Sequence, residues 1–237
     1  MIPVQPQPEP EGFEDAVRKP GQRTIAEVVG LPGLTPRRGR PRKHRAVSLK
    51  TLRSQMFTEH WTACLEDLRQ AYGSICAYLA VFIPPDSSTP TVDHFHSRSA
   101  CVEAARRCRK PETAARALQP IYEWRNYCLS SLPMNSHKGD SEDVLDPFEI
   151  LPGWFRINFS DGSVHPGVGL APDVTEKVQQ TISRLRLSSG HCCQRRVGDF
   201  ELYRSRDVSL RYLQTISPFV AAELRRQGLL HPEDVEE

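Results

Sequence analysis

The sequence predicts an α+β fold, in which a small strand–strand–helix core is embedded in a mostly helical domain and follows a disordered, basic N-terminal arm. Three observations support this fold class. Apolar residues recur at steps of three or four from Trp61 to Tyr72, as in an amphipathic helix. Residues 91–95 and 122–130 have the composition of short strands. Eight of the 20 prolines fall within the first 41 residues, which lack a sustained apolar period.

These patterns divide the chain into three parts. Residues 1–57 form the Pro-rich, largely disordered arm, with residues 1–23 disordered throughout. Residues 58–205 form the domain that carries the chemistry, and residues 206–237 a C-terminal helix and an acidic tail. Within the domain we expect helices at 61–72, 99–117 and 172–187, strands at 91–95 and 122–130, the start of a polar helix at 134–138, and a hairpin over 154–164. Residues 76–83 fit either a buried helix end or a short strand, and the last helix spans about 208–227.

The net charge of +2 conceals a basic block in the arm, because no Asp or Glu occurs between Glu27 and Glu59. Within this block, residues 38–41 read Arg-Gly-Arg-Pro, which matches the core of an AT-hook. The arginines of such a segment enter the narrow minor groove of A·T-rich DNA. We therefore expect the arm to bind DNA through Arg38, Arg40, Arg42 and Lys43. The alternative is a solvated tether whose charge only favours solubility.

The chain starts with neither the basic residues nor the apolar core of a signal peptide. Its longest apolar run, residues 76–83, is too short to cross a bilayer. We expect a cytoplasmic protein with no membrane partner, in which the seven scattered cysteines are reduced thiols.

Three polar residues fall where the expected strands and helix could bring them together. Asp93 and His94 end the first strand, and Asn135 begins the helix that follows the second strand. A carboxylate and an amide oxygen are the hard ligands that Mg²⁺ or Mn²⁺ prefers. A neutral imidazole beside them can deprotonate water near neutral pH. This set of residue types suits the hydrolysis of a phosphodiester bond.

The flanks of these residues resemble a known motif. Residues 91–99, Thr-Val-Asp-His-Phe-His-Ser-Arg-Ser, resemble the Asp-His-Phe-x-Pro-Lys/Arg-Ser segment of HNH (ββα-metal) endonucleases. Residues 122–126, Tyr-Glu-Trp-Arg-Asn, and residues 135–139, Asn-Ser-His-Lys-Gly, resemble the second half of that motif, with its nine-residue gap between the two asparagines. The resemblance extends over roughly residues 60–200 and implies a ββα-metal core and nuclease activity.

The resemblance implies a role for each matching residue. Asp93 and Asn135 would be the metal ligands and His94 the general base, while Asn126 would hold the loop that bears the histidine. Lys138 and Arg98 would contact the phosphate. His96 and His137 are rivals for the metal or base roles, and His137 is an alternative to Asn135 as the second ligand.

The sequence also departs from the motif. Ser97 stands where the motif has proline, and the long gap between His94 and Asn126 predicts an inserted helix. Many HNH domains hold a structural zinc with two Cys-x-x-Cys pairs, but the corresponding positions here are Cys76, Leu79, Ser131 and Met134. Three of four ligands are therefore missing, and we expect apolar packing in place of structural zinc. The adjacent Cys192 and Cys193 are expected to be buried or loop thiols.

Downstream segments extend the resemblance to one subfamily. Residues 145–148 and 181–187 resemble the C-terminal part of a defence-associated HNH subfamily, which includes the nuclease subunit of Septu-type antiphage systems. The resemblance implies a DNA endonuclease in bacterial antiphage defence, working with a separately encoded ATPase. Two alternatives stay open: a noncatalytic DNA-binding module that depends on the basic arm, and a toxin-like RNase.

Overall fold

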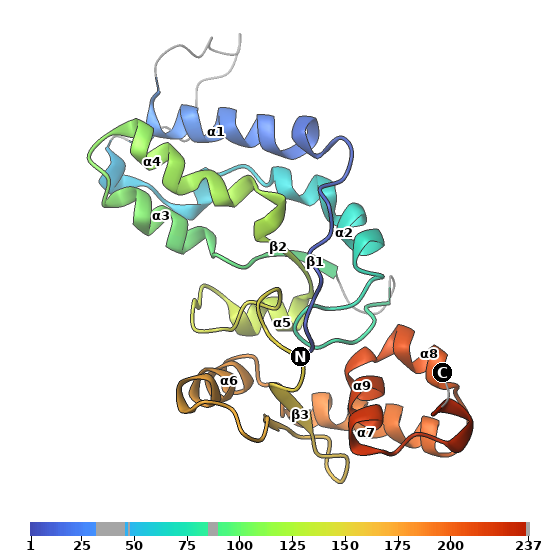
Figure 1. The fold of residues 1–237 in the computed structure, drawn as a ribbon. Coiled ribbons are helices and arrows are strands. Elements are labelled where there is room, and N and C mark those ends of the chain that lie inside the picture. Colours follow the sequence, from blue (N-terminus) through green and yellow to red (C-terminus); the bar gives the residue numbers. More distant parts are fainter. Residues whose placement is uncertain (32–45, 47, 85–89, 236–237) are drawn as a thin grey trace.

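The computed structural model describes residues 1–31, 46, 48–84 and 90–235. The chain forms a mixed α+β fold in which helices predominate and two separate two-stranded antiparallel sheets are present among these residues (Figure 1). The α+β class expected from the sequence is confirmed. One continuous group of buried apolar side chains connects the N-terminal helices, the first sheet and the C-terminal helices.

The first sheet lies near the centre of the molecule. Strand β1 (Pro90–His94) pairs antiparallel with β2 (Tyr127–Ser131), so that Asp93 lies opposite Cys128 and His94 opposite Tyr127. Helix α5 (Leu132–Lys138) follows β2 directly and contacts both strands. The expected order of strand, strand and helix is therefore present. It brings the end of β1 next to the side chains of α5.

Two helices, not one, separate the paired strands. Helix α3 (Arg98–Arg106) begins with Ser97 as its N-cap, whose side chain accepts a hydrogen bond from the backbone of Ala100. Helix α4 (Pro111–Leu118) packs against α3. The single helix expected at 99–117 is interrupted because Pro111 lacks the N–H that a continuous helix needs and instead occupies the first helical position. The expected inserted helix is thus a helical pair.

The N-terminal segment is ordered, which corrects the expectation of disorder over residues 1–23. A single π-helical stretch (Glu14–Arg18) leads into α1 (Lys19–Val29), and Phe13, Val17 and Ile25 are buried. The apolar residues recur at helical spacing but are dispersed among prolines and charges. Pro20 is the second residue of α1, which directly follows the π-helical stretch. Helix α1 packs against α4 (Figure 1).

The basic residues Arg38, Arg40, Arg42 and Lys43 lie outside the described residues. The residues that flank this segment are described. The backbone N–H of Leu31 donates to Ala26, and that of Ala46 donates to Val28 at 3.2 Å. Leu31 and Ala46, on either side of this segment, therefore both lie at the C-terminal end of α1.

Residues 57–83 lead from this connection to the first sheet. A 3₁₀ turn (His60–Cys64) precedes α2 (Leu65–Ala71), as expected from the apolar period. Residues 76–83 form neither the helix end nor the strand that the sequence allowed. They form a buried loop closed by an isolated bridge between Ile75 and Phe82, in which Tyr78 is fully buried. The loop places Tyr78 beneath β1.

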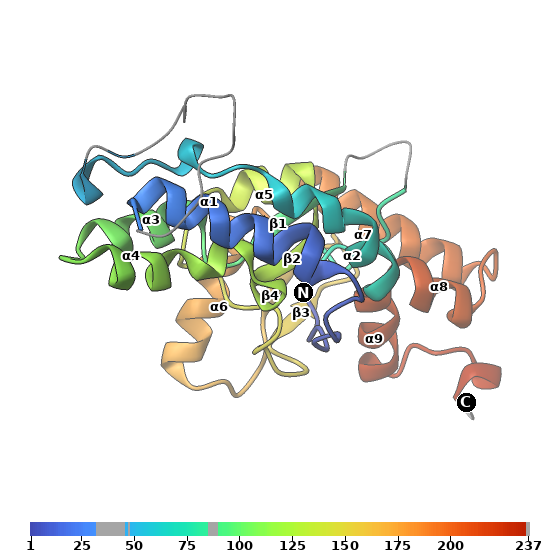
Figure 2. The same ribbon diagram turned by 90° about the horizontal axis from the view of Figure 1, so that it is seen from above.

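The C-terminal third adds the second sheet and four helices (Figure 2). Strands β3 (Phe155–Ile157) and β4 (Val164–Pro166) form the expected hairpin, and α6 (Pro172–Arg184) follows as expected. Helix α7 (Gly190–Arg204), which contains Cys192 and Cys193, was not predicted from the sequence. The expected last helix is divided by Pro218 into α8 (Leu210–Ile216) and α9 (Pro218–Gln227). Within the described part of the chain, every helix is too short or too polar to cross a bilayer.

Candidate active site

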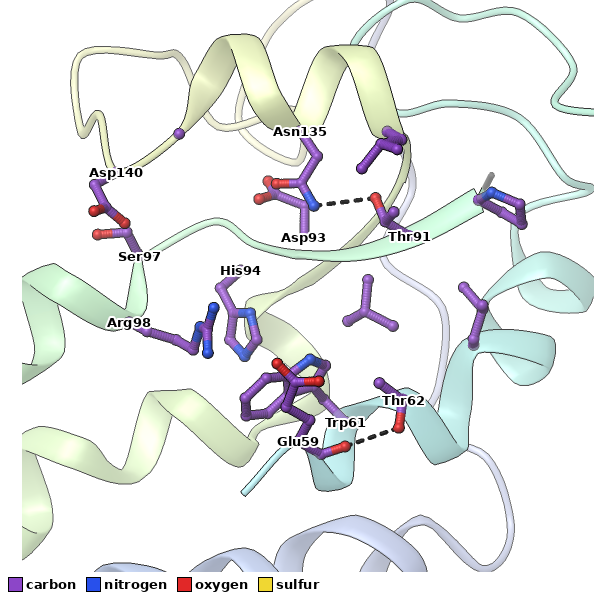
Figure 3. Close-up of a pocket in the computed structure, with 15 residues that line it drawn as sticks. Glu59, Trp61, Thr62, Thr91, Asp93, His94, Ser97, Arg98, Asn135 and Asp140 are labelled. Carbon is purple, nitrogen blue, oxygen red and sulfur yellow. Dashed lines mark hydrogen bonds between the residues drawn. The ribbon is translucent and has the colours of Figure 1, made fainter. Parts of the chain in front are cut away.

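A pocket of about 570 Å³ opens where the end of β1 meets α5, the start of α3 and the 3₁₀ turn at residues 60–64 (Figure 3). The side chains of Asp93, His94 and Asn135 all line this pocket. Neighbouring residues on a strand point to opposite faces, and Asp93 and His94 leave β1 on opposite sides (Figure 3). Both line the pocket, which extends along the whole of β1. Other lining residues that can carry charge are Glu59, Arg98 and Asp140.

His94 is held in one protonation state and one tautomer. Its side chain is buried, and burial lowers its pKa to about 3, so the ring is neutral at physiological pH. Its Nε2 lies 3.0 Å from the backbone oxygen of Ile121. A carbonyl oxygen only accepts hydrogen bonds, so Nε2 carries the ring proton and donates it. Nδ1 is consequently left with a free lone pair, which is the requirement for a general base.

Asp93 is buried beside two hydrogen-bond donors. The hydroxyl of Tyr78 donates to its Oδ2, and the ammonium of Lys138 lies 3.4 Å from the same oxygen. Burial raises the pKa of the Asp93 carboxyl above its ordinary value, while the charge of Lys138 lowers it in part. These two donors fix the orientation of the carboxylate. Since a carboxylate has about four lone-pair positions, acceptor capacity remains on the pocket side.

Lys138 does not have the position that the motif implies. Its ammonium is buried, with the residue only 1% exposed, and donates to the backbone oxygen of His94 at 2.7 Å. It does not line the pocket, because α5 directs its side chain beneath β1. The expectation of a phosphate contact is therefore corrected: in this structure Lys138 supports the Asp93–His94 pair from inside the fold.

Asn126 binds the turn that follows β1. Its Oδ1 accepts a hydrogen bond from the backbone N–H of His96 at 2.7 Å, and its Nδ2 donates to the backbone oxygens of His96 and Pro120. Three hydrogen bonds from one buried side chain fix the backbone between His94 and α3. Asn126 does not itself line the pocket. Its contacts match the loop-holding role that the resemblance implies, not a direct part in chemistry.

Asn135 projects from the first turn of α5 towards Asp93 (Figure 3). Its Nδ2 donates to the hydroxyl of Thr91 at 3.1 Å, which turns its amide oxygen away from that contact. Asn135 is half-buried and lines the pocket with Asp93. The carboxylate and the amide oxygen together make a pair of hard donors on one side of β1.

The two rival histidines lie elsewhere. His137 points to the other side of α5, where its Nδ1 is 3.2 Å from the backbone oxygen of Leu185. It lines a separate surface pocket with Arg184 and Arg186. His96 is exposed and lies 3.3 Å from Glu142. Neither residue lines the pocket that contains Asp93, so neither replaces Asn135 or His94 in this arrangement.

Several residues of the site were not identified from the sequence. The Trp61 ring packs edge-on against His94, at 4.8 Å between ring centroids, and the guanidinium of Arg98 lies 4.8 Å from the centre of the Trp61 ring. Trp61 thus positions both the imidazole and the cation. Its helical spacing indicated only a core residue, and Tyr78 was part of an apolar run. In both cases the sequence predicted burial but not the polar partner.

The donor set is suited to a divalent ion that keeps part of its water shell. Within the described residues, no three His, Cys, Asp or Glu side chains form a group able to hold a metal. Asp93 and the amide oxygen of Asn135 would supply two oxygen ligands, and the pocket has room for water at the other positions. Mg²⁺ commonly binds in this way, through one or two protein ligands and several waters. All seven cysteines are free thiols.

Comparison with protein-family models gives no match to this chain, and a search of curated proteins finds no significant match.

Proposed function

We propose that this chain is a metal-dependent endonuclease of the HNH type, which hydrolyses phosphodiester bonds in DNA. The observation that carries this proposal is the convergence of Asp93, His94 and Asn135 on one pocket, at the end of a strand–strand–helix unit. Each side chain supplies a group that hydrolysis uses: a carboxyl oxygen, a neutral imidazole with a free nitrogen, and an amide oxygen.

The residues of the chain divide the reaction between them. Nδ1 of His94 takes the proton of the attacking water, and the hydrogen bond from Nε2 to Ile121 keeps the ring in the required tautomer. Asp93 and Asn135 would hold Mg²⁺ or Mn²⁺. The bound ion would stabilise the negative charge that develops on the phosphate and the leaving oxygen. Lys138 and Tyr78 keep the Asp93 carboxylate in place throughout.

Arg98 is the cation that lines the pocket in the described structure, and we assign it the phosphate contact. The Trp61 ring supports its guanidinium, so the charge is held near His94 without a carboxylate partner in the described residues. A guanidinium can form two parallel hydrogen bonds with phosphate oxygens. This assignment leaves Lys138 as a structural residue.

The resemblance to the defence-associated subfamily supports a more specific setting for the same chemistry. In that setting the nuclease acts on DNA in the bacterial cytoplasm, during antiphage defence, with an ATPase encoded separately. The chain itself contains no Gly-x-x-x-x-Gly-Lys phosphate-binding loop, so nucleotide hydrolysis would have to come from that partner.

Digestion of supercoiled plasmid with the full chain tests the proposal. We expect nicking or linearisation with Mg²⁺ or Mn²⁺, no cutting in EDTA, and at least a hundredfold loss in His94→Ala. His191→Ala changes an exposed histidine on α7 and is the matched control, which should cut normally. Undiminished cutting by a folded His94→Ala protein would refute the assignment of the base. A parallel digestion of RNA separates a DNA endonuclease from an RNase.

A further inference from the structure

The surface of α3 is joined to residues 48–56, which contain two short 3₁₀ turns and which the sequence analysis placed in the disordered arm. Residues 48–56 run alongside α3 in the opposite direction. The guanidinium of Arg106 donates twice to the backbone oxygen of Leu52, at 2.6 and 3.0 Å, and Leu52 is fully buried. Nearer the start of α3, the hydroxyls of Ser54 and Ser99 lie 3.2 Å apart. Residues 48–56 are therefore a fixed part of this surface (Figure 2).

This surface is strongly basic. Residues 48–56 and 98–110 contain seven cations and one acid, although the net charge of the whole chain is only +2. The acid, Glu103, pairs with Arg106 and Arg107. Four other cations are exposed and have no ion pair within the described structure: Lys50, Arg53, Arg109 and Lys110. We call these four residues, with Arg98, Arg106 and Arg107, the α3 track.

The α3 track leads to the pocket. Its first member on the helix, Arg98, lines the pocket, whereas Arg109 and Lys110 lie beyond the far end of α3. A nine-residue helix is about 13 Å long, which equals the rise of about four base pairs along the axis of B-DNA. The cations of the track are thus spread over a length that spans several phosphates of a duplex. The phosphate next to Arg98 would lie at the pocket.

The composition of the track favours a duplex over a single strand. Single-stranded nucleic acid is usually bound by aromatic side chains that stack on its bases. Residues 48–56 and 98–110 contain no Phe, Tyr or Trp, so the track offers cations without a stacking surface. Such a surface suits a partner whose bases are already stacked and whose phosphates are regularly spaced.

We propose that the α3 track binds the phosphate backbone of double-stranded DNA and directs it to the pocket at Arg98. This inference rests on the proposed nuclease function, since it names the surface by which the same site receives its substrate. Contacts of this kind are independent of base sequence and are weakened by salt, because each neutralised phosphate releases counterions.

A charge-neutralising variant and a matched control test the inference. Lys50→Gln/Arg53→Gln/Arg109→Gln removes three exposed cations of the track. Lys177→Gln/Arg211→Gln/Arg225→Gln removes three exposed cations from α6, α8 and α9, at the other end of the molecule (Figure 1). Binding to a labelled 30-base-pair DNA is measured by fluorescence anisotropy in EDTA at several salt concentrations. Duplex RNA and single-stranded DNA of the same length serve as competitors.

We expect the track variant to bind duplex DNA at least tenfold more weakly, with the slope of log K against log salt reduced by about 2 to 3. The control variant should bind like the wild type. Equal losses in both variants, no loss in the track variant, or tighter binding of either competitor would overturn the inference. Hydrolysis of bis(p-nitrophenyl) phosphate separates the two proposals, because it should survive in the track variant but not in His94→Ala.

Discussion

The ammonium of Lys138 donates a hydrogen bond to the backbone oxygen of His94 and lies 3.4 Å from the carboxylate of Asp93. One buried cation therefore contacts both of the adjacent residues to which we assign the chemistry. It compensates the charge of Asp93 and fixes the backbone of His94. The pocket is consequently built on an interior ion pair, whose loss affects folding as well as catalysis.

Removal of the Lys138 charge should destabilise the fold. Lys138→Met leaves Asp93 buried without its counter-charge, and we expect a loss of about 3 to 5 kcal/mol in the free energy of unfolding. The double variant Lys138→Met/Asp93→Asn should recover part of this loss, since no buried charge then remains. Urea unfolding of the two single variants and the double variant measures the coupling. Strictly additive losses would show that the two side chains do not interact.

The neutral state of His94 should make stability depend on pH. The folded pKa of about 3 is below the ordinary value of 6.5, so between these values the unfolded chain binds a proton that the folded chain does not. The contribution of His94 to stability is therefore full above about pH 6.5 and decreases as pH falls, by up to about 1.4 kcal/mol per pH unit.

Urea unfolding at pH 7 and pH 5 measures this dependence. His94→Ala should show a shallower decrease in stability than the wild type, and His191→Ala should decrease as the wild type does. Parallel decreases in wild type and His94→Ala would mean that His94 is not held neutral by burial.

Arg98 should contribute to the reaction through its guanidinium and not only through its charge. Arg98→Gln removes both, and we expect a loss of about a hundredfold in cleavage rate, comparable to the loss of one preorganised donor to a developing anion. Arg98→Lys keeps the charge but loses the paired hydrogen bonds and the planar contact with Trp61, so its rate should be intermediate. Plasmid cleavage rates of the three proteins measure this order. Equal rates in Arg98→Lys and Arg98→Gln would contradict it.

The packing of α1 can be tested with two glycines. A Cβ at Gly21 would lie 2.2 Å from the ring of Tyr122, whereas a Cβ at Gly198 in α7 would meet no atom within 4 Å. Gly21→Ala should therefore lower the free energy of unfolding by about 1 to 3 kcal/mol. Gly198→Ala should stabilise it by about 0.5 to 1 kcal/mol, since alanine favours helix. Thermal unfolding that is unaffected by Gly21→Ala would mean that α1 does not pack on Tyr122.

The sequence predicted the parts of the fold that have a regular apolar period. Residues 61–71 and α6 followed from such periods. The two strands were expected from their composition, but the strand expected at 122–130 begins only at Tyr127, because the residues before it form 3₁₀ turns. The order of these elements brought Asp93, His94 and Asn135 together. Helix α7 was missed because its polar and apolar residues alternate irregularly around the helix. The N-terminal helices were missed because prolines and charges interrupt their apolar positions. Their structure depends on packing against distant parts of the chain, which no local pattern shows.

The polar partners of the site were less predictable than its main residues. The resemblance implied a phosphate contact for Lys138, but the direction of a side chain from a short helix depends on its tertiary contacts, and Lys138 is buried. The Tyr78 contact depends on a buried loop with no regular period, in which Ala80 has a positive φ of 53°. Such contacts join residues that are distant in sequence, and no local pattern identifies them.

The Mn²⁺ affinity of the DNA-free protein tests the central claim most directly, because it measures the pocket without requiring turnover. Electron paramagnetic resonance can titrate free Mn²⁺ against the wild type, Asn135→Ala and Asn135→Asp. If Asp93 and Asn135 are the ligands, Asn135→Ala should bind at least tenfold more weakly, and Asn135→Asp, which adds a carboxylate, at least as tightly as the wild type. The same affinity in all three proteins would contradict the account.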